Sequence, residues 1–336
     1  MNSYNRMRGR TTIVIIALAV ITALLLIADI AIGSTNVPFA GVVKSLMGEK
    51  TEWSNIVIDI RLVRSIMALL AGVALSVSGL QMQVLFRNPL AGPYVLGVSA
   101  GASLGVALFI LGAPLLGAIS PALSSLGTAG SAWIGSALVL MAVVALARRV
   151  KDIVVILILG MMLSSAIGAV VEMMQYFGSE EALKSYVVWT MGSLGDITKS
   201  QLAIIAPVIA LGTILSVFAI KPMNMLLAGE RYAVSMGLNI GRTRRIILAS
   251  TALLAGSITA FCGPIGFVGL ASPHIARMII RSADHRTLLP TTTLVGCTMM
   301  LASDIVAKVL VLPINTITAL LGIPIVVYIV IRNRSL

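Results

Sequence analysis

Long apolar runs that are nearly free of charge dominate this chain and decide what it can fold into. The clearest extend from Thr12 to Ile32, from Ala203 to Ile220 and from Ile246 to Phe261. A helix needs about 20 apolar residues to cross the hydrocarbon core of a bilayer. Only 11% of the residues are charged, against roughly 25% in soluble domains. The sequence therefore predicts an all-α membrane protein that crosses the bilayer many times.

The positions of the charged residues predict the topology. With the N-terminus inside, the cytoplasmic segments hold 17 of the 24 basic residues and three of the 12 acids. Cytoplasmic loops are rich in Lys and Arg, so this orientation is favoured, and an even number of spans places both termini in the cytoplasm. The net charge of +12 thus reflects topology and not a nucleic-acid-binding face. We expect ten spans, at residues 11–33, 62–84, 94–115, 130–147, 153–175, 200–220, 245–262, 267–281, 290–308 and 317–331.

Two connections between spans are long enough to hold structure of their own. Residues 34–59 lie on the outer side of the membrane, and we expect a short surface helix within them. Residues 221–245 lie inside, and apolar residues recur there at helical spacing around Ala233 and Met236. A helical cytoplasmic loop of this size favours an interaction surface over a solvated connector.

Two short motifs resemble catalytic or nucleotide-binding sequences, but their context excludes both readings. GEKT at residues 48–51 lacks the core of an ATP-binding loop and lies outside. GVSAG at residues 97–101 has the pattern of a catalytic-serine turn, yet it lies in an apolar span. Gly97, Gly101 and Gly105 predict instead a helix face that a neighbouring helix approaches closely.

The residues that could hold a metal are few and scattered. His274 and His285 do not form a ligand pair, and Cys262 and Cys297 are expected to be small buried residues. We therefore expect no metal site, no cofactor bound by this chain and no enzymatic activity of its own.

Ionisable groups inside membrane spans are expensive and indicate function by default. Glu172, Asp304 and Lys308 are the candidates, and the last two lie four residues apart on one helix face, as in an i,i+4 ion pair. Residues 261–277 and 311–324 are broken by Pro and Gly. Because non-helical backbone at membrane depth must be buried or line a cavity, these two segments are expected to line a path.

Eight motifs follow one another from Arg61 to the C-terminus. In order they are RLVR (61–64), RNPLAGP (87–93), WTMGSLG (189–195), GERYAVSMG (229–237), GPIGFVGLASPHIAR (263–277), DHRTLLP (284–290), ASDIVAK (302–308) and LPINTITALLGIP (312–324). Together they resemble the FecCD-type permease subunits of type II ABC importers, which carry iron chelates, haem and cobalamin. The resemblance implies the permease fold of that family as one domain over residues 1–336, with a coupling loop at about 221–245.

The resemblance also implies roles for particular residues at the two faces of the membrane. On the outer face, Arg61 and Arg64 would pair with glutamates of a substrate-binding protein. Lys308 stands where the family usually has Arg, and the resemblance favours a docking contact there over the ion pair. Coupling to the ATP-binding subunits would fall to Gly229, Glu230, Ala233 and Gly237.

The translocation path is the third feature to which the resemblance assigns residues. Asn88 and Leu90 would help to close a cytoplasmic gate. Asn315 departs from a position where the family often has Gly. The broken segments that would line the path contain Pro264, Pro273, Pro313 and Asn315.

These implications define an expected function. The chain would be the permease subunit of a binding-protein-dependent importer in the bacterial plasma (inner) membrane, with an iron chelate, siderophore or haem, as substrate. Its partners would be a second copy of itself, two ATP-binding subunits that carry ATP and Mg²⁺, a substrate-binding protein and membrane lipid, and no nucleic acid. Cobalamin is the alternative substrate, and an ion-coupled secondary transporter is the alternative of another class.

Overall fold

The computed structural model describes residues 2–33, 35–112, 121–147 and 153–333. Within these ranges every regular element is a helix, which confirms the predicted all-α fold. In chain order they are α1 (Asn2–Ala31), α2 (Phe39–Leu46), η1 (Ile56–Arg61), α3 (Leu62–Phe86), α4 (Val98–Ile110), α6 (Pro121–Ala147), α7 (Ile153–Phe177), α8 (Glu180–Thr190), α9 (Lys199–Phe218), α10 (Ile220–Leu227), α11 (Glu230–Ser235), α12 (Ile240–Cys262), α13 (Val268–Ile280), α14 (His285–Leu310) and α15 (Ile314–Asn333).

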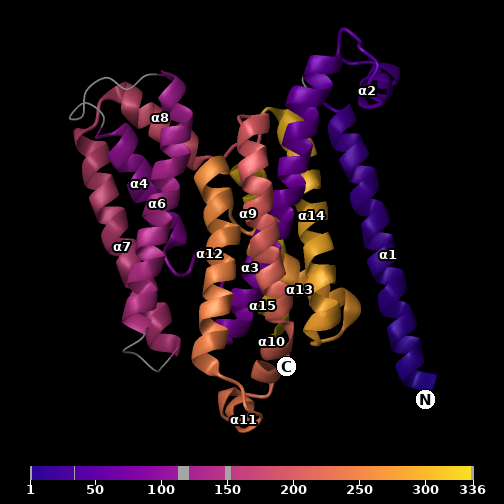
Figure 1. The fold of residues 1–336 in the computed structure, drawn as a ribbon, viewed down its shortest axis with the longest axis vertical. Helices are drawn as coiled ribbons and strands as arrows, with labels where there is room; N and C mark the ends of the chain where they lie inside the picture. The colour runs from indigo at the N-terminus through magenta and orange to yellow at the C-terminus, as the bar shows by residue number, and fades with distance from the viewer. Residues whose placement is uncertain (1, 34, 113–120, 148–152, 334–336) are drawn as a thin grey trace.

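The described helices fit a protein that crosses the membrane several times. Five are long and apolar enough to span a bilayer, and four more are apolar but shorter. These nine helices and α3 coincide with the ten predicted spans. Both termini lie at the same end of the bundle as α11, while α2 and α8 lie at the opposite end (Figure 1). This arrangement matches the predicted topology, in which the termini and residues 221–245 share the cytoplasmic side.

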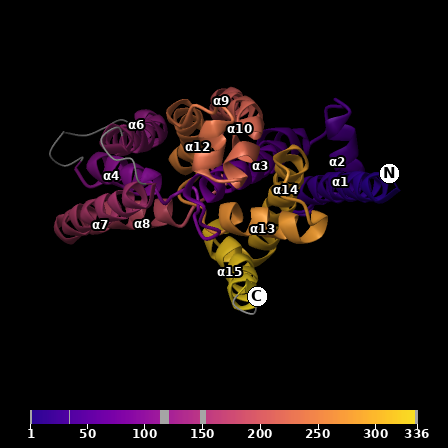
Figure 2. The ribbon, with the colours of Figure 1, turned by 90° about the horizontal axis from the view of Figure 1, so that it is seen from below.

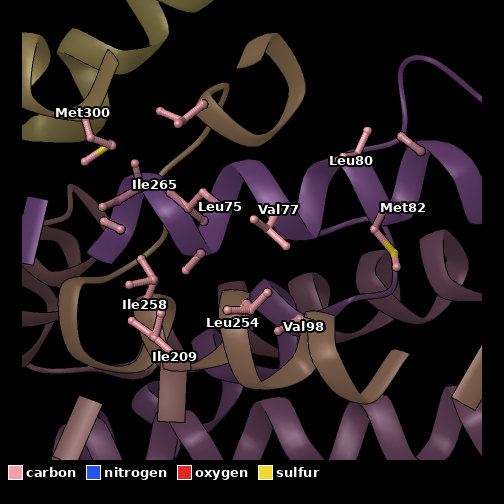
Figure 3. Close-up of a cluster of buried hydrophobic side chains, with 14 of the residues drawn as sticks. Leu75, Val77, Leu80, Met82, Val98, Ile209, Leu254, Ile258, Ile265 and Met300 are labelled. Carbon is pink, nitrogen blue, oxygen red and sulfur yellow. The ribbon is translucent and has the colours of Figure 1, made fainter. Parts of the chain in front are cut away.

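Helix α3 lies at the centre of the bundle, between α12, α13 and α14 (Figure 2). Most of its side chains from Met67 to Phe86 are buried. Leu75, Val77 and Leu80 belong to a buried cluster that also includes side chains of α9, α12 and α14 (Figure 3). Helix α1 runs along one edge of the bundle and exposes apolar side chains, as a lipid-facing helix does.

Glycines bring pairs of helices into backbone contact. A Cβ added at Gly101 would overlap the backbone of Gly135, and one at Gly105 would overlap that of Ser131. The predicted close-approach face is therefore confirmed at these two positions, between α4 and α6. Gly97 differs, because it precedes α4 in the left-handed region at φ 79° and lies against Ser164 of α7.

The helix ends differ from the predicted spans where capping groups act. Helix α14 begins at His285 and not at 290, since the Asp284 carboxylate accepts a hydrogen bond from the Arg286 amide at 2.9 Å. The predicted span 94–115 is shorter in the structure, because turns extend to Gly97 before α4 begins. Residues 113–115 of that predicted span lie outside the described residues.

Candidate functional site

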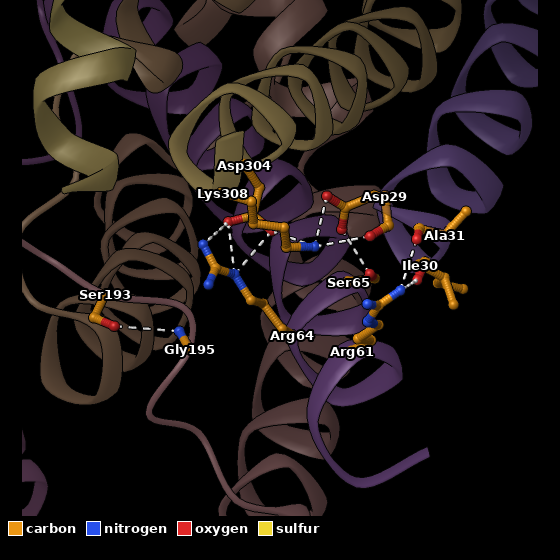
Figure 4. Close-up of polar contacts among 10 residues, drawn as sticks. All are labelled: Asp29, Ile30, Ala31, Arg61, Arg64, Ser65, Ser193, Gly195, Asp304 and Lys308. Carbon is orange, nitrogen blue, oxygen red and sulfur yellow. Dashed lines mark hydrogen bonds and ion pairs between the residues drawn. The ribbon is translucent and has the colours of Figure 1, made fainter. Parts of the chain in front are cut away.

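At the outer end of the bundle four charged side chains form one connected group, the outer charge cluster, made of Asp29, Arg64, Asp304 and Lys308 (Figure 4). Lys308 Nζ lies 2.8 Å from Asp29 Oδ1 and 3.0 Å from Asp304 Oδ2. The Arg64 guanidinium donates Nη2–H to Asp304 Oδ1 at 2.8 Å and Nε–H to Asp304 Oδ2 at 3.1 Å. Both carboxylates are fully buried, so two cations and two anions neutralise each other inside the protein.

Arg61 lies beside this cluster but binds backbone and not carboxylate. Its guanidinium donates to the carbonyls of Ile30, Ala31 and Thr35, and the residue is only 4% exposed. These carbonyls lie at and just beyond the C-terminal end of α1, where helix carbonyls lack intrahelical partners. Arg61 therefore caps α1 and holds it against α3.

An open cavity of about 520 Å³ lies at the same outer end. Arg61, Arg64 and Lys308 line it, together with residues 192–194 and 311–314. The Asp304–Lys308 ion pair expected from their spacing is confirmed, and Lys308 is buried within it. Of the three basic groups, Arg64 keeps the most exposed side chain, at 26%. Docking of a binding protein through these residues stays a prediction.

At the inner end the segment after α3 is folded into a compact turn. Arg87 ends α3 in the left-handed region at φ 47°. The side chain of Asn88 accepts a hydrogen bond from the Leu90 amide at 2.9 Å, and Leu90 is 46% exposed. His274 of α13 donates from Nε2 to the carbonyl of Pro89 at 2.7 Å, which ties this segment to α13. The structure thus places both predicted gate residues at the inner end, in a turn held by another helix.

The predicted coupling residues lie in and around α11, the element farthest from the outer face (Figure 1). Gly229 and Gly237 flank the helix with φ of 107° and 85°, values that favour glycine. Ala233 is fully buried, and the Glu230 carboxylate accepts a hydrogen bond from Arg244 of α12 at 2.8 Å. The predicted residues therefore hold the loop in place, while other side chains form its exposed surface.

A polar link joins α10 to the start of α14 on the same side. The Asn224 amide donates to Asp284 Oδ1 at 2.6 Å, and its Oδ1 accepts from the backbone amide and from Nδ1 of His285. The Asp284 carboxylate accepts hydrogen bonds from the Arg286 amide and from the Asn224 side chain. These bonds, chiefly the one from Arg286, hold the pKa of Asp284 below its usual value. Residues 221–245 are thus tied to the bundle by side chains as well as by packing.

The two segments expected to be broken by Pro and Gly, residues 261–277 and 311–324, are non-helical over only part of their length. Between α12 and α13 the chain is non-helical around Pro264, where Asn315 Oδ1 accepts a hydrogen bond from the Gly266 amide at 3.0 Å. Pro313 lines the outer cavity. The chain is not broken at Pro273, because α13 continues through this buried residue as the predicted span 267–281 has it, and the path-lining role of Pro273 stays a prediction. A buried helix can continue through a proline when neighbouring helices pack around it.

Sequence reasoning missed three residues that organise these ends. Asp29 lies inside the first predicted span, and an acid at that position should have been a candidate like Glu172. Asn224 and His274 gave no such signal, because their partners are distant in sequence. Among the described residues, no group of three or more His, Cys, Asp or Glu side chains is placed to hold a metal ion.

Comparisons with known proteins identify a family and several relatives of this chain. The FecCD transport family matches residues 20–332. The hemin transport system permease protein HmuU of Yersinia pestis is 34% identical over 321 residues, which covers 93% of this chain and 95% of that protein. The vitamin B12 import system permease protein BtuC of Klebsiella pneumoniae is 34% identical over 284 residues, or 82% of each chain. A solved metal-chelate type ABC transporter in an inward-facing conformation superposes with a TM-score of 0.81 at 28% identity, covering 95% of this chain and 99% of that one.

The helical bundle and these relatives define a multi-pass membrane permease of the type II ABC importer class. Within that class, the chain belongs to the FecCD transport family.

Proposed function

We propose that this chain is the permease subunit of an importer for an iron chelate, either a siderophore or haem, and that the whole chain acts as one transmembrane domain. Two copies would form the translocation path between them. Two separate ATP-binding subunits, which hold ATP and Mg²⁺, would bind at the cytoplasmic side and drive transport. A substrate-binding protein would deliver the chelate to the outer side.

The observation that carries this proposal is the exposed apolar surface of α11. Tyr232, Val234 and Met236 are 69%, 57% and 51% exposed at the cytoplasmic end of the bundle. They are held there by the buried Ala233 and by the Glu230–Arg244 ion pair. Apolar side chains fixed on a small, rigid projection fit a cleft in another protein subunit.

The outer cavity supports the proposed docking of the binding protein. Arg64 lines it with a partly exposed guanidinium, and an acidic side chain of the partner would meet that charge first. Arg61 and Lys308 are more buried than Arg64. Arg61 already binds backbone carbonyls of α1, and Lys308 already forms an ion pair with Asp29. We therefore propose Arg64 as the docking contact, and Arg61 and Lys308 as residues that shape and polarise the cavity.

The relatives support the choice of substrate class. The hemin permease aligns with 93% of this chain, and the vitamin B12 permease aligns with 82% at the same identity. Haem or another iron chelate is therefore favoured, and cobalamin is the alternative. An ion-coupled carrier is disfavoured, since the acids Asp29 and Asp304 are engaged in ion pairs at the outer end and not near the middle of a span.

The proposal is tested by reconstituting the chain with its ATP-binding partner and its binding protein. Uptake of the ferric chelate should require ATP, and Met236→Glu should abolish both uptake and binding of the ATP-binding subunit. Met47→Glu is the matched control, because Met47 is 77% exposed at the opposite end and should tolerate the same change. Uptake without ATP, or uptake that survives Glu230→Arg, would show an ion-coupled carrier instead.

A further inference from the structure

Helix α14 runs from the cytoplasmic side of the bundle to the outer charge cluster and has polar contacts at both ends (Figure 1). It begins at His285, beside α10, and its last turns carry Asp304 and Lys308. About 30 Å of continuous helix separates Asp304 from that first residue, at 1.5 Å for each residue. Between these points α14 packs along α1, α3 and α13. One helix thus joins the outer charge cluster to the cytoplasmic side.

The cytoplasmic start of α14 is held by one side chain of α10, Asn224. Its Nδ2 donates to Asp284 Oδ1 at 2.6 Å, and its Oδ1 accepts from the backbone amide of His285 at 2.8 Å and from His285 Nδ1 at 2.7 Å. Because Asp284 caps α14, Asn224 binds both the cap and the first residue of the helix. His285 is 1% exposed, and within the described part of the chain its Nε2 has no hydrogen-bond partner. The orientation of this buried ring therefore depends on Asn224.

Helix α10 connects this contact to the predicted coupling loop. Met223 and Leu226 of α10 are buried, and α10 leads into α11 through Ala228 and Gly229. In space, α10 packs against both α14 and α11. A displacement of α14 is therefore passed through Asn224 to the element that carries the exposed apolar surface of α11.

The outer end of α14 responds to the position of Arg64. The guanidinium of this partly exposed residue binds Asp304 through two nitrogen atoms. An acidic partner that draws this guanidinium towards itself leaves Lys308 to neutralise both Asp29 and Asp304. A buried carboxylate that loses a cation is costly, so the cluster and the outer end of α14 rearrange. Packed helices shift as units between discrete arrangements, so the displacement reaches the cytoplasmic end.

We propose that α14 transmits docking of the binding protein to the ATP-binding subunits, and that Asn224 is the positioning residue that passes this motion to α10 and α11. The inference rests on the proposed function, which supplies the two partners. It adds the helix and the residue through which docking on the outer face raises ATP hydrolysis on the inner face. Two sites are coupled when both bias the same element, and α14 has contacts with the structures at both sites.

The ratio of stimulated to basal ATPase activity tests this role. The complete complex is assayed with and without the binding protein, loaded in turn with haem and with cobalamin. Asn224→Ala should lower the ratio about fivefold or more, because the hydrogen-bonded link between α10 and α14 is lost. Docking affinity without ATP should be unchanged, since the outer charge cluster is intact. Ser282→Ala is the matched control, because it removes a hydrogen bond to the Asp284 amide in the same turn but no contact with α10.

Reversing the hydrogen-bond roles separates transmission from a loss of folded protein. Asn224→Asp alone places two carboxylates against each other, because Asn224 Nδ2 lies 2.6 Å from Asp284 Oδ1, and should lower the ratio as Asn224→Ala does. Adding Asp284→Asn restores a donor and an acceptor at this contact, and Asn caps a helix as well as Asp does. The double variant should therefore recover the stimulation. Because the readout is a ratio, the amount of folded complex does not change it.

Stimulation that survives Asn224→Ala would overturn the proposal, as would a double variant that responds no better than Asn224→Asp. Failure of the proposed function would appear separately in the unmodified complex, as uptake that does not depend on ATP.

Discussion

At the scale of single residues, the outer charge cluster shows how charges are kept inside a membrane protein. Asp29 and Asp304 are fully buried, and Lys308 lies between them within 3.0 Å of each. Removing one partner of a buried ion pair leaves an uncompensated charge, which costs far more than the pair contributes. The cluster therefore depends on each of its members.

Replacing Lys308 gives a direct test of this dependence. Lys308→Met leaves Asp29 without a cationic partner and should lower the free energy of unfolding by about 3–5 kcal/mol. The loss is measured as a fall in the thermal unfolding midpoint in detergent. Lys44→Met is the control, because Lys44 is 59% exposed in a long ion pair of 3.9 Å that contributes about 0–1 kcal/mol. Equal melting of the two variants would contradict the interpretation.

Only part of this cluster could be read from the sequence. The Asp304–Lys308 pair was visible because i,i+4 neighbours share one helix face. Arg64 and Asp29 join it through contacts that span 240 and 279 positions in the chain, and no local pattern carries that information. Likewise, nothing local indicates that Arg61 turns towards the end of α1 and not towards a protein partner.

At the scale of elements, packing of α4 against α6 depends on glycine. The backbones meet at Gly105 and Ser131 so closely that no side chain fits between them. The repeat of glycine every four residues predicted this face, since it follows from helical geometry alone. Which helix approaches it could not be predicted, because that choice depends on the tertiary arrangement.

Two alanine substitutions separate this contact from intrinsic helix propensity. Gly105→Ala should lower the free energy of unfolding by about 1–3 kcal/mol, because its Cβ would overlap the Ser131 carbonyl. Gly130→Ala on α6 meets nothing within 4 Å and should be neutral or stabilise by about 0.5–1 kcal/mol. Thermal unfolding of both variants in detergent checks the difference in sign. A neutral Gly105→Ala would show that the helices are free to separate.

The spans themselves were the most predictable elements, because hydropathy integrates over about 20 residues. Their ends were less predictable, since single side chains such as Asp284 decide where a helix begins. Short helices such as α8 and α10 follow the longer ones directly and carry no hydropathy signal of their own. Pro273 lies inside the predicted span 267–281, but the sequence does not show the surrounding bundle in which α13 continues through this proline.

At the scale of the whole molecule, the proposed contacts with partners lie at opposite ends of the bundle. The outer cavity with Arg64 faces away from the cytoplasm, and α11 is at the other end (Figure 1). Substitutions at the two ends should therefore impair different steps. This separation also shows which substitutions are unsuitable, since Arg61→Glu would place a buried carboxylate against backbone carbonyls and disturb folding.

Arg64→Gln is the substitution that tests docking, and its thermal unfolding in detergent shows separately how far the lost pair with Asp304 lowers stability. It removes the partly exposed charge, while Asp304 keeps its ion pair with Lys308. The binding protein should bind the complex about tenfold more weakly, since one charge-assisted contact is lost. Basal ATPase activity should remain, and stimulation of that activity by the loaded binding protein should fall. Lys199→Gln, which removes an exposed outer cation paired with Asp59, is the matched control and should bind normally. Unchanged affinity in Arg64→Gln would mean that Arg64 serves only the outer charge cluster and that docking occurs elsewhere on the outer face.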